Sequence, residues 1–165
     1  MSPMGEGHGY QHLWTEAVGA SKGQNAWITW FNNDRFYTAT SFVSSSDQLI
    51  FGRLGANDPN FNLRRDPCFI IRKPAQKDAL FVSAIEPHGQ YNTVTEIPIQ
   101  PFRSIERIEV LVDSPNYTVL KIINQNGKYF DFMIANQNAD PEAKHEINLN
   151  NTNYQWTSPV GISHN

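Results

Sequence analysis

Hydrophobic and polar residues alternate along most of this chain, with the two-residue period of half-buried β-strands. In 35–43, for example, the even-numbered residues from Phe36 to Phe42 would face one side of a sheet and the odd-numbered residues the other. Further β-branched or aromatic runs of this kind occupy 26–31, 48–54, 68–73, 79–86, 104–113, 117–123, 128–135, 144–150 and 154–157. Helical periodicity is nearly absent, and only 141–144 is typical of a helical turn. The pattern therefore predicts about ten short strands.

Turn-forming residues separate these runs. Asn32-Asn33-Asp34 joins 26–31 to 35–43 and predicts a hairpin, and an Asn-Gly pair at 126–127 joins 117–123 to 128–135. Many short strands with regular turn signals indicate an all-β fold, an antiparallel β-sandwich. With 165 residues, the chain is expected to form a single domain over 1–165.

Composition excludes several classes of protein. The net charge is −3, whereas a nucleic-acid-binding domain is normally basic, so no nucleic-acid partner is expected. No segment approaches the ~20 apolar residues of a membrane helix, and the first residues do not resemble a signal peptide, so no membrane partner is expected either. The single cysteine, Cys68, excludes an internal disulfide and a four-cysteine zinc site. Its apolar surroundings are typical of an inert core thiol.

Two long irregular stretches hold most of the distinctive chemistry, and the first is 55–67. It contains Arg64 and Arg65, within a basic stretch that carries five cations and two acids between residues 53 and 73. A guanidinium group can bind a carboxylate through two hydrogen bonds, so one of these arginines could hold an anionic substrate. Alternatively, an arginine pairs with Asp58 or Asp66 and only holds the loop in place.

The second stretch, 87–101, follows a predicted strand and contains a Pro-Gly turn. Glu86, His88 and Tyr91 lie at this strand exit, where they could transfer protons, contact substrate or bind a metal. In the alternative interpretation, Glu86 caps the loop backbone while His88 and Tyr91 pack against its floor.

Two other groups of residues have side chains that could bind a ligand. On a helix, His8 and His12 would share a face and could bind a metal, but in the strand that the pattern favours they would be about 13 Å apart, too far for one ion. We expect no metal site and no cofactor in this chain. The four tryptophans could form a platform for stacking sugars, or they could pack in the core, which is the commoner use in a sandwich. These tryptophans are Trp14, Trp27, Trp30 and Trp156.

Five strings, taken in order, resemble the C-terminal part of oligoalginate lyases, which belong to the heparinase II/III-like group, polysaccharide lyase family 17. They are GYQHLWTEA, WITWFNNDRFYTAT, GANDPNFNLRRDPCFIIRK, FVSAIEPHGQYNTVTE and DFMIANQNADPEAKH. The GANDPNFNLRR and EPHG strings are the most specific, because neither follows from generic strand composition.

This resemblance implies a modular bacterial enzyme, periplasmic or extracellular, that acts on an acidic polysaccharide or oligosaccharide. In such an enzyme an N-terminal α/α toroid precedes the β region, and the substrate cleft lies between them. A base removes the C5 proton of a uronate and an acid protonates the leaving glycosidic oxygen, which is β-elimination. The toroid and the family's structural metal site fall outside this chain, so the isolated chain is expected to be inactive.

The resemblance also implies that a glutamate of this C-terminal stretch contacts the substrate, and Glu86 is the best match. His88, Tyr91, Arg64 and Arg65 are weaker substrate-binding candidates, and no catalytic residue is predicted within the chain. We therefore expect a β-sandwich that forms one wall of a lyase cleft and contacts the missing toroid. The alternatives are a carbohydrate-binding module that stacks sugars on exposed tryptophans and a purely structural domain.

Overall fold

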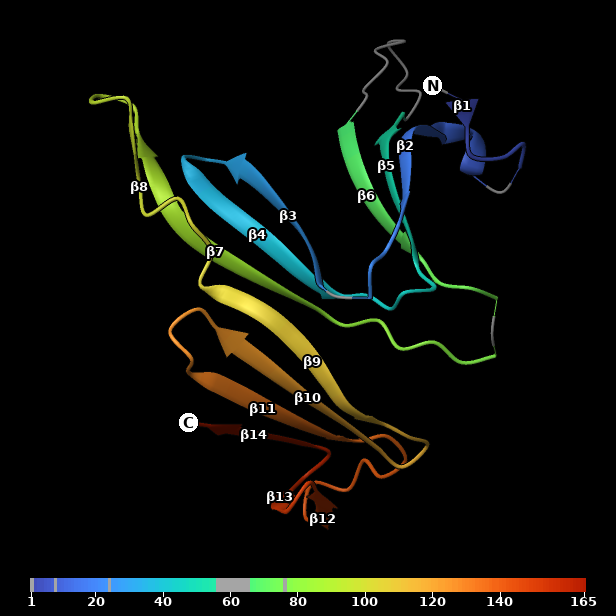
Figure 1. Ribbon diagram of the computed structural model, residues 1–165, viewed down its shortest axis with the longest axis vertical. Coiled ribbons are helices and arrows are strands. Elements are labelled where there is room, and N and C mark those ends of the chain that lie inside the picture. Colours follow the sequence, from blue (N-terminus) through green and yellow to red (C-terminus); the bar gives the residue numbers. More distant parts are fainter. Residues whose placement is uncertain (1, 8, 24, 56–65, 76) are drawn as a thin grey trace. The chain divides into compact units, whose positions relative to one another are not determined.

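The computed structural model describes residues 2–7, 9–23, 25–55, 66–75 and 77–165, and it consists almost wholly of β-strands in antiparallel sheets (Figure 1). The strands are β1 (Ser2–Pro3), β2 (Leu13–Ala20), β3 (Asn25–Asn32), β4 (Arg35–Phe42), β5 (Gln48–Leu54), β6 (Asp66–Arg72), β7 (Ser83–Asn92), β8 (Ile97–Ile99), β9 (Ile105–Asp113), β10 (Tyr117–Asn124), β11 (Tyr129–Ala135), β12 (Lys144–Leu149), β13 (Thr152–Thr157) and β14 (Val160–His164). A short 3₁₀ turn, η1 (Tyr10–His12), precedes β2. The predicted all-β sandwich class is confirmed. No helix in the described ranges is long and apolar enough to cross a membrane.

The chain divides into two compact units, which are described separately. Unit 1 contains Met1–Gln24 and Val43–Ala79, and unit 2 contains Asn25–Phe42 and Leu80–Asn165. The single domain over 1–165 remains a prediction.

Unit 1 is one antiparallel sheet with the strand order β1-β2-β5-β6. A buried ion pair closes one end of the β5–β6 pair, where the Lys73 ammonium lies 2.8 Å from the Asp47 carboxylate. The same carboxylate accepts hydrogen bonds from the backbone N–H and the hydroxyl of Ser44. Because these donors surround the carboxylate, the ion pair fixes the turn that enters β5.

Unit 2 begins with a sheet of order β3-β4-β7-β8. Asn33 and Asp34 join β3 to β4 with positive φ angles of 48° and 61°, the geometry of the tight turn that matches the twist of a hairpin. Thr38 and Thr40 are both fully buried, while Tyr37 and Ala39 point to the other face. The predicted hairpin and its alternation are therefore confirmed.

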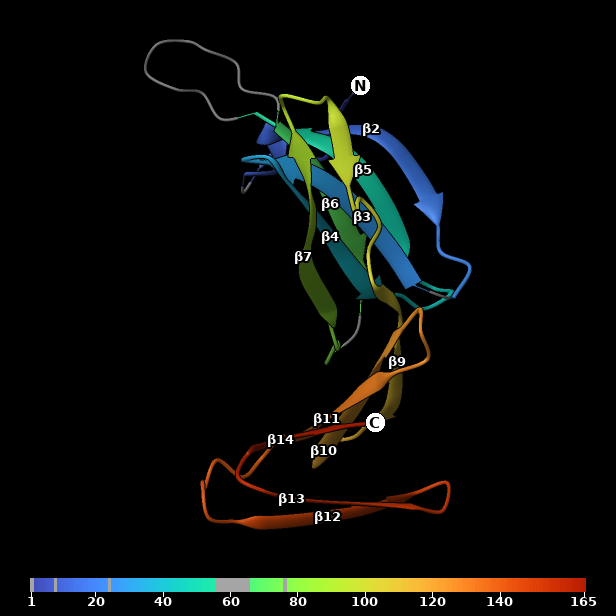
Figure 2. The same ribbon diagram turned by 90° about the vertical axis from the view of Figure 1, so that its left-hand side faces the viewer.

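A second sheet of unit 2, with the order β14-β11-β10-β9, is covered by the β12–β13 hairpin (Figure 2). The core between these two layers contains Val119, Met133, Ala135, Tyr154 and Trp156. Gly161 on β14 is necessary for this packing, because a Cβ atom there would lie 2.5 Å from the Cβ of Trp156. The strands predicted at 104–113, 117–123, 128–135, 144–150 and 154–157 are confirmed, and β14 was not predicted.

The stretch 87–101, predicted to be irregular, is instead partly strand. β7 continues from Ser83 to Asn92, and β8 pairs with its last three residues. The prediction was wrong at Pro87, because proline cannot donate a hydrogen bond to a β-ladder and therefore indicates the end of a strand. Since β8 pairs with β7 only from Gln90 onward, β7 is an edge strand at Pro87, where proline is tolerated.

Candidate functional site

The structure places three of the five predicted site residues on one strand. Glu86, His88 and Tyr91 all lie on β7, so the prediction that they occupy a Pro-Gly turn after a strand is corrected. Arg64 and Arg65 lie outside the described residues, as does His8. The substrate-binding roles of all five candidates remain predictions.

A bulge at Gly89 brings Glu86, His88 and Tyr91 to the same face of the sheet. His88 pairs with Phe36 and Gln90 pairs with Arg35, so Gly89 is an extra residue in β7. The extra residue shifts the alternation of side chains by one position. Gln90 therefore points to the opposite face, and Tyr91 lies on the face that carries Glu86 and His88. We call this surface of β3, β4 and β7 the β7 face; its members discussed below are Trp27, Thr29, Phe31, Phe36, Thr38, Thr40, Glu86, His88 and Tyr91.

Only glycine fits at the bulge. The φ angle of Gly89 is +54°, a conformation that residues with a side chain seldom adopt. A Cβ atom at this position would also lie 2.1 Å from the carbonyl oxygen of Gln100 and 2.5 Å from that of Ile99. The close approach of the backbone at Ile99 and Gln100 to β7 thus depends on the glycine.

His88 is held on the β7 face by two contacts. Its Nε2 atom lies 2.8 Å from the hydroxyl of Thr38, which is itself 2.7 Å from the hydroxyl of Thr29. Its ring stacks on Phe36, with 6.2 Å between the centroids. The Nδ1 atom is buried and has no hydrogen-bond partner in the described part of the chain. The imidazole is therefore oriented through Nε2, while Nδ1 is enclosed by the surrounding side chains.

The carboxylate of Glu86 is held in place by three hydrogen bonds. It accepts hydrogen bonds from the backbone N–H groups of Ser104 and Ile105, at 2.7 and 3.1 Å, and from the Ser104 hydroxyl. These bonds tie β7 to the first residue of β9. Since a carboxylate has about four acceptor positions, Glu86 retains capacity for one further donor.

Tyr91 lies beside Phe31, which meets its ring edge-on with 6.1 Å between the centroids. Its backbone N–H donates to the carbonyl of Asp34, in the turn between β3 and β4. The phenol is thus positioned by packing on the same face as the imidazole of His88.

Arg103 is a further candidate that the sequence analysis missed. Its guanidinium lies over the ring of Trp27, 4.3 Å from the centroid, and its Nε atom is buried without a hydrogen-bond partner among the described residues. Arg103 directly precedes Ser104, the partner of Glu86. A lone arginine outside any motif gives no signal in the sequence, because Trp27 lies far earlier in the chain.

The tryptophans of unit 2 do not form a common platform. Trp156 is buried in the core, while Trp27 and Trp30 lie on opposite faces of their strand. Trp30 stacks on Tyr37 at 5.6 Å. Trp14 belongs to unit 1, where it lies on β2.

Among the described residues, no group of three or more His, Cys, Asp or Glu side chains is arranged to hold a metal ion. Cys68 is a free, half-buried thiol on β6, opposite Gly52.

The chain has an all-β fold with a polar, aromatic-rich sheet surface, and comparison with known proteins finds similarity to two alginate lyases. The chain is 32% identical over 153 residues, 93% of its length, to an alginate lyase of Stenotrophomonas maltophilia. It is 30% identical over 159 residues, 94% of its length, to an exo-oligoalginate lyase of Saccharophagus degradans. No protein-family profile matches it. The chain spans only 20% and 21% of the lengths of these two relatives, so it is similar to a domain-sized part of alginate lyases.

Proposed function

We propose that this chain is the C-terminal β-sandwich domain of a longer lyase that cleaves uronate-containing, alginate-type polysaccharides by β-elimination, and that it forms one wall of the substrate cleft. The observation that carries the proposal is the similarity to two alginate lyases over more than nine-tenths of the chain. Polysaccharide lyase family 17 is the family that the sequence resembles most specifically. The enzyme would act in the periplasm or outside a bacterial cell.

The chemistry of the β7 face supports a substrate-facing role. β-Elimination needs a base near C5, an acid at the leaving oxygen and a group that neutralises the uronate carboxylate. Glu86 and Tyr91 can bind sugar hydroxyls, and His88 helps to order this face through its contacts with Thr38 and Phe36. The guanidinium of Arg103 suits the uronate carboxylate, since arginine binds carboxylates through two parallel hydrogen bonds. The base and the acid would come from the rest of the enzyme, including its α/α toroid.

The opposite face of the same sheet supports a contact with the remainder of a longer protein. Two rows of apolar side chains cross β3, β4 and β7 there, one formed by Ile28, Ala39 and Ile85 and the other by Trp30, Tyr37 and Pro87. Ile85 is 64% exposed and Trp30 is 38% exposed. Because the relatives are about five times longer than this chain, the remaining part of the enzyme is the occupant that we propose for this face.

The role of Arg103 can be tested in the longer protein that contains this chain. Formation of unsaturated uronate from oligoalginate is followed for Arg103→Ala and for a matched control, Arg107→Ala. Arg107 is an exposed arginine whose partners are Glu106 and Glu109. We expect Arg103→Ala to lower kcat/KM by roughly tenfold or more, since it removes a hydrogen bond to a charged group, and Arg107→Ala to leave it unchanged.

Heparin serves as the second substrate in this assay. Turnover of oligoalginate but not heparin supports the alginate-type assignment, and the reverse would overturn it. Full activity of Arg103→Ala would show that Arg103 does not bind the substrate. If Arg103→Ala has a lowered melting temperature, Arg103→Lys is tested in its place, because lysine keeps the charge but lacks the planar pair of donors.

A further inference from the structure

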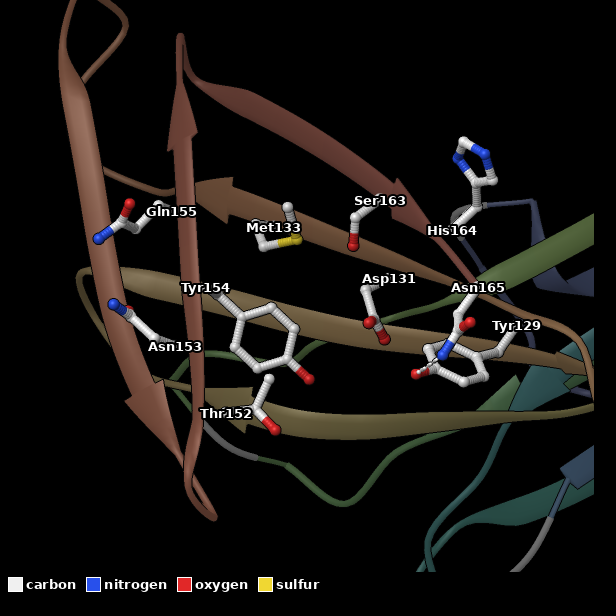
Figure 3. Close-up of a pocket in the computed structure, with 10 residues that line it drawn as sticks. All are labelled: Tyr129, Asp131, Met133, Thr152, Asn153, Tyr154, Gln155, Ser163, His164 and Asn165. Atoms are coloured by element: carbon white, nitrogen blue, oxygen red, sulfur yellow. Dashed lines mark hydrogen bonds between the residues drawn. The ribbon is translucent and has the colours of Figure 1, made fainter.

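A polar groove lies in unit 2 between the four-stranded sheet and the β12–β13 hairpin (Figure 3). Its volume is about 330 Å³, within the size range of small-molecule sites. Strands β11, β13 and β14 contribute most of its walls. This groove is separate from the β7 face, and ligand binding in it does not depend on the proposed lyase function.

The groove exists because the apolar core between the sheet and the hairpin covers only the C-terminal half of β11. Residues 129, 131, 133 and 135 all point toward the hairpin, and the last two, Met133 and Ala135, pack in the core with Tyr154 and Trp156. At the N-terminal end of β11 the inward-facing positions 129 and 131 carry polar groups. Asp131 there pairs with Lys121 on one side and with Ser163 on the other.

Asp131 is buried without adequate donors. The residue is only 6% exposed, and its Oδ1 atom has no hydrogen bond in the described part of the chain. The nearest cation, Lys121, is 3.5 Å away and also lies over the ring of Tyr129. Burial raises the pKa of Asp131 more than the charge of Lys121 lowers it. Apart from this long ion pair, the Oδ1 atom has no donor among the described residues, and a buried acceptor with few donors is unfavourable, so a ligand with hydroxyl donors would be stabilised here.

The rest of the lining, which includes His164, is rich in hydrogen-bonding groups. Figure 3 shows the Asp131 carboxylate and the Tyr154 hydroxyl pointing into the same groove. Tyr129 supplies a second phenol, whose hydroxyl accepts a hydrogen bond from the Asn165 amide at 2.9 Å. Ser163 adds an aliphatic hydroxyl. Aromatic rings beside hydroxyl, amide and carboxylate groups suit a ligand with apolar ring faces and several hydroxyls.

We propose that this groove binds a neutral pyranose sugar, with two adjacent ring hydroxyls donating hydrogen bonds to the carboxylate of Asp131. A uronate is disfavoured, because its own carboxylate would lie near that of Asp131, whose charge Lys121 already offsets. The ring of Tyr129 would contact an apolar face of the sugar, and the hydroxyl of Tyr154, whose ring is buried in the core, would bond a ring hydroxyl.

The test is a titration of the ¹⁵N-labelled 165-residue chain followed by NMR, with D-mannose, D-glucose and D-galactose as neutral probes and oligomannuronate as the anionic probe. We expect at least one hexose to shift the backbone amide signals of Tyr129, Asp131, Tyr154 and Ser163, with a Kd of about 1–10 mM, an affinity typical of a few hydrogen bonds in water. Asp131→Asn should weaken this binding roughly tenfold, as expected when a charged hydrogen-bond acceptor is lost.

Asp113→Asn is the matched control, because Asp113 is an exposed aspartate at the end of β9 in the same sheet. It should leave the affinity unchanged. Tyr154→Phe is a second variant that removes one hydroxyl and keeps the packing, and it should also weaken binding. An unchanged overall spectrum shows that each variant is folded.

Three results would overturn the proposal. Absence of groove shifts with every hexose would mean that the groove holds only water. Shifts caused by oligomannuronate alone would mean that the ligand is anionic. Hexose shifts that persist unchanged in Asp131→Asn would remove Asp131 as the binding group.

Discussion

The carboxylate of Glu86 accepts a hydrogen bond from the backbone N–H of Ser104 at 2.7 Å, and this contact joins β7 to the start of β9. The neighbouring N–H of Ile105 donates to the same oxygen at 3.1 Å. Glu86 was predicted to contact substrate, and in this position it also anchors the chain segment that carries Arg103. A substitution at Glu86 would therefore change stability as well as any contact with substrate.

Replacement of Glu86 by alanine should lower the free energy of unfolding by about 1–3 kcal/mol, because two backbone N–H groups lose their acceptor. Ser104→Ala removes only the hydroxyl donor and should lower it by about 1 kcal/mol or less. Urea denaturation of the 165-residue chain measures both values. Equal stability of Glu86→Ala and the unsubstituted chain would mean that these hydrogen bonds contribute nothing in solution.

Thr38 and Thr40 offer a matched pair, since both side chains are fully buried on the β7 face. The Thr38 hydroxyl bonds Thr29 and His88, whereas that of Thr40 has no partner among the described residues. Thr38→Val should therefore lower the free energy of unfolding by about 1–3 kcal/mol, while Thr40→Val should be neutral or stabilising. Thermal and urea unfolding give both numbers. Similar losses for the two variants would contradict the hydrogen-bond chain to His88.

Gly89→Ala should destabilise unit 2 strongly, because the new Cβ would collide with the carbonyl oxygens of Gln100 and Ile99. Gly127→Ala is the control: its φ is also positive, at +81°, but nothing lies within 4 Å of the added atom. The control should lose only about 1 kcal/mol, the strain of the left-handed conformation. Melting temperatures compare the two, and a Gly89→Ala variant as stable as the control would show that the bulge is not packed against 99–100.

The buried ion pair of unit 1 predicts a dependence of stability on pH. Burial opposes ionisation of Asp47, but the hydrogen bonds from Lys73 and Ser44 outweigh it, so its pKa lies below the ordinary value. Ionised Asp47 thus stabilises the folded chain above the unfolded pKa of about 3.9, and this contribution is lost as the pH falls through the lower folded pKa. We expect Asp47→Asn to lose about 3–5 kcal/mol near neutral pH, as when one partner of a buried pair is removed.

The control for this prediction is Glu16→Gln, which removes the partner of Arg53 in a more exposed pair of the same unit. It should lose at most about 1 kcal/mol. Urea unfolding between pH 2 and 7 should also show a weaker acid-side loss of stability for Asp47→Asn than for the unsubstituted chain. Parallel pH profiles for the two proteins would contradict the lowered pKa.

The strands could be predicted from the sequence where alternation and turn residues agree, as at Asn33 and Asp34 between β3 and β4. The continuation of β7 could not, because Pro87 and Gly89 are turn residues in most settings, and only the pairing with β4 and β8 makes them part of a strand. Arg103 was missed since its contact with Trp27 is tertiary. Asp131, by contrast, had a signal: it is a charged residue at an inward position of the alternating run 129–135.

The central claim is that this chain is one domain of a longer alginate-type lyase, and an assay of β-elimination on oligoalginate tests it most directly. The absorbance of unsaturated uronate is measured for three proteins: the longer protein that contains the chain, the same protein without it, and the isolated 165-residue chain. We predict turnover by the longer protein and none by either part alone. Turnover by the isolated chain would show that it carries a complete acid and base set of its own, and inactivity of the longer protein on oligoalginate would contradict the assignment as an alginate lyase.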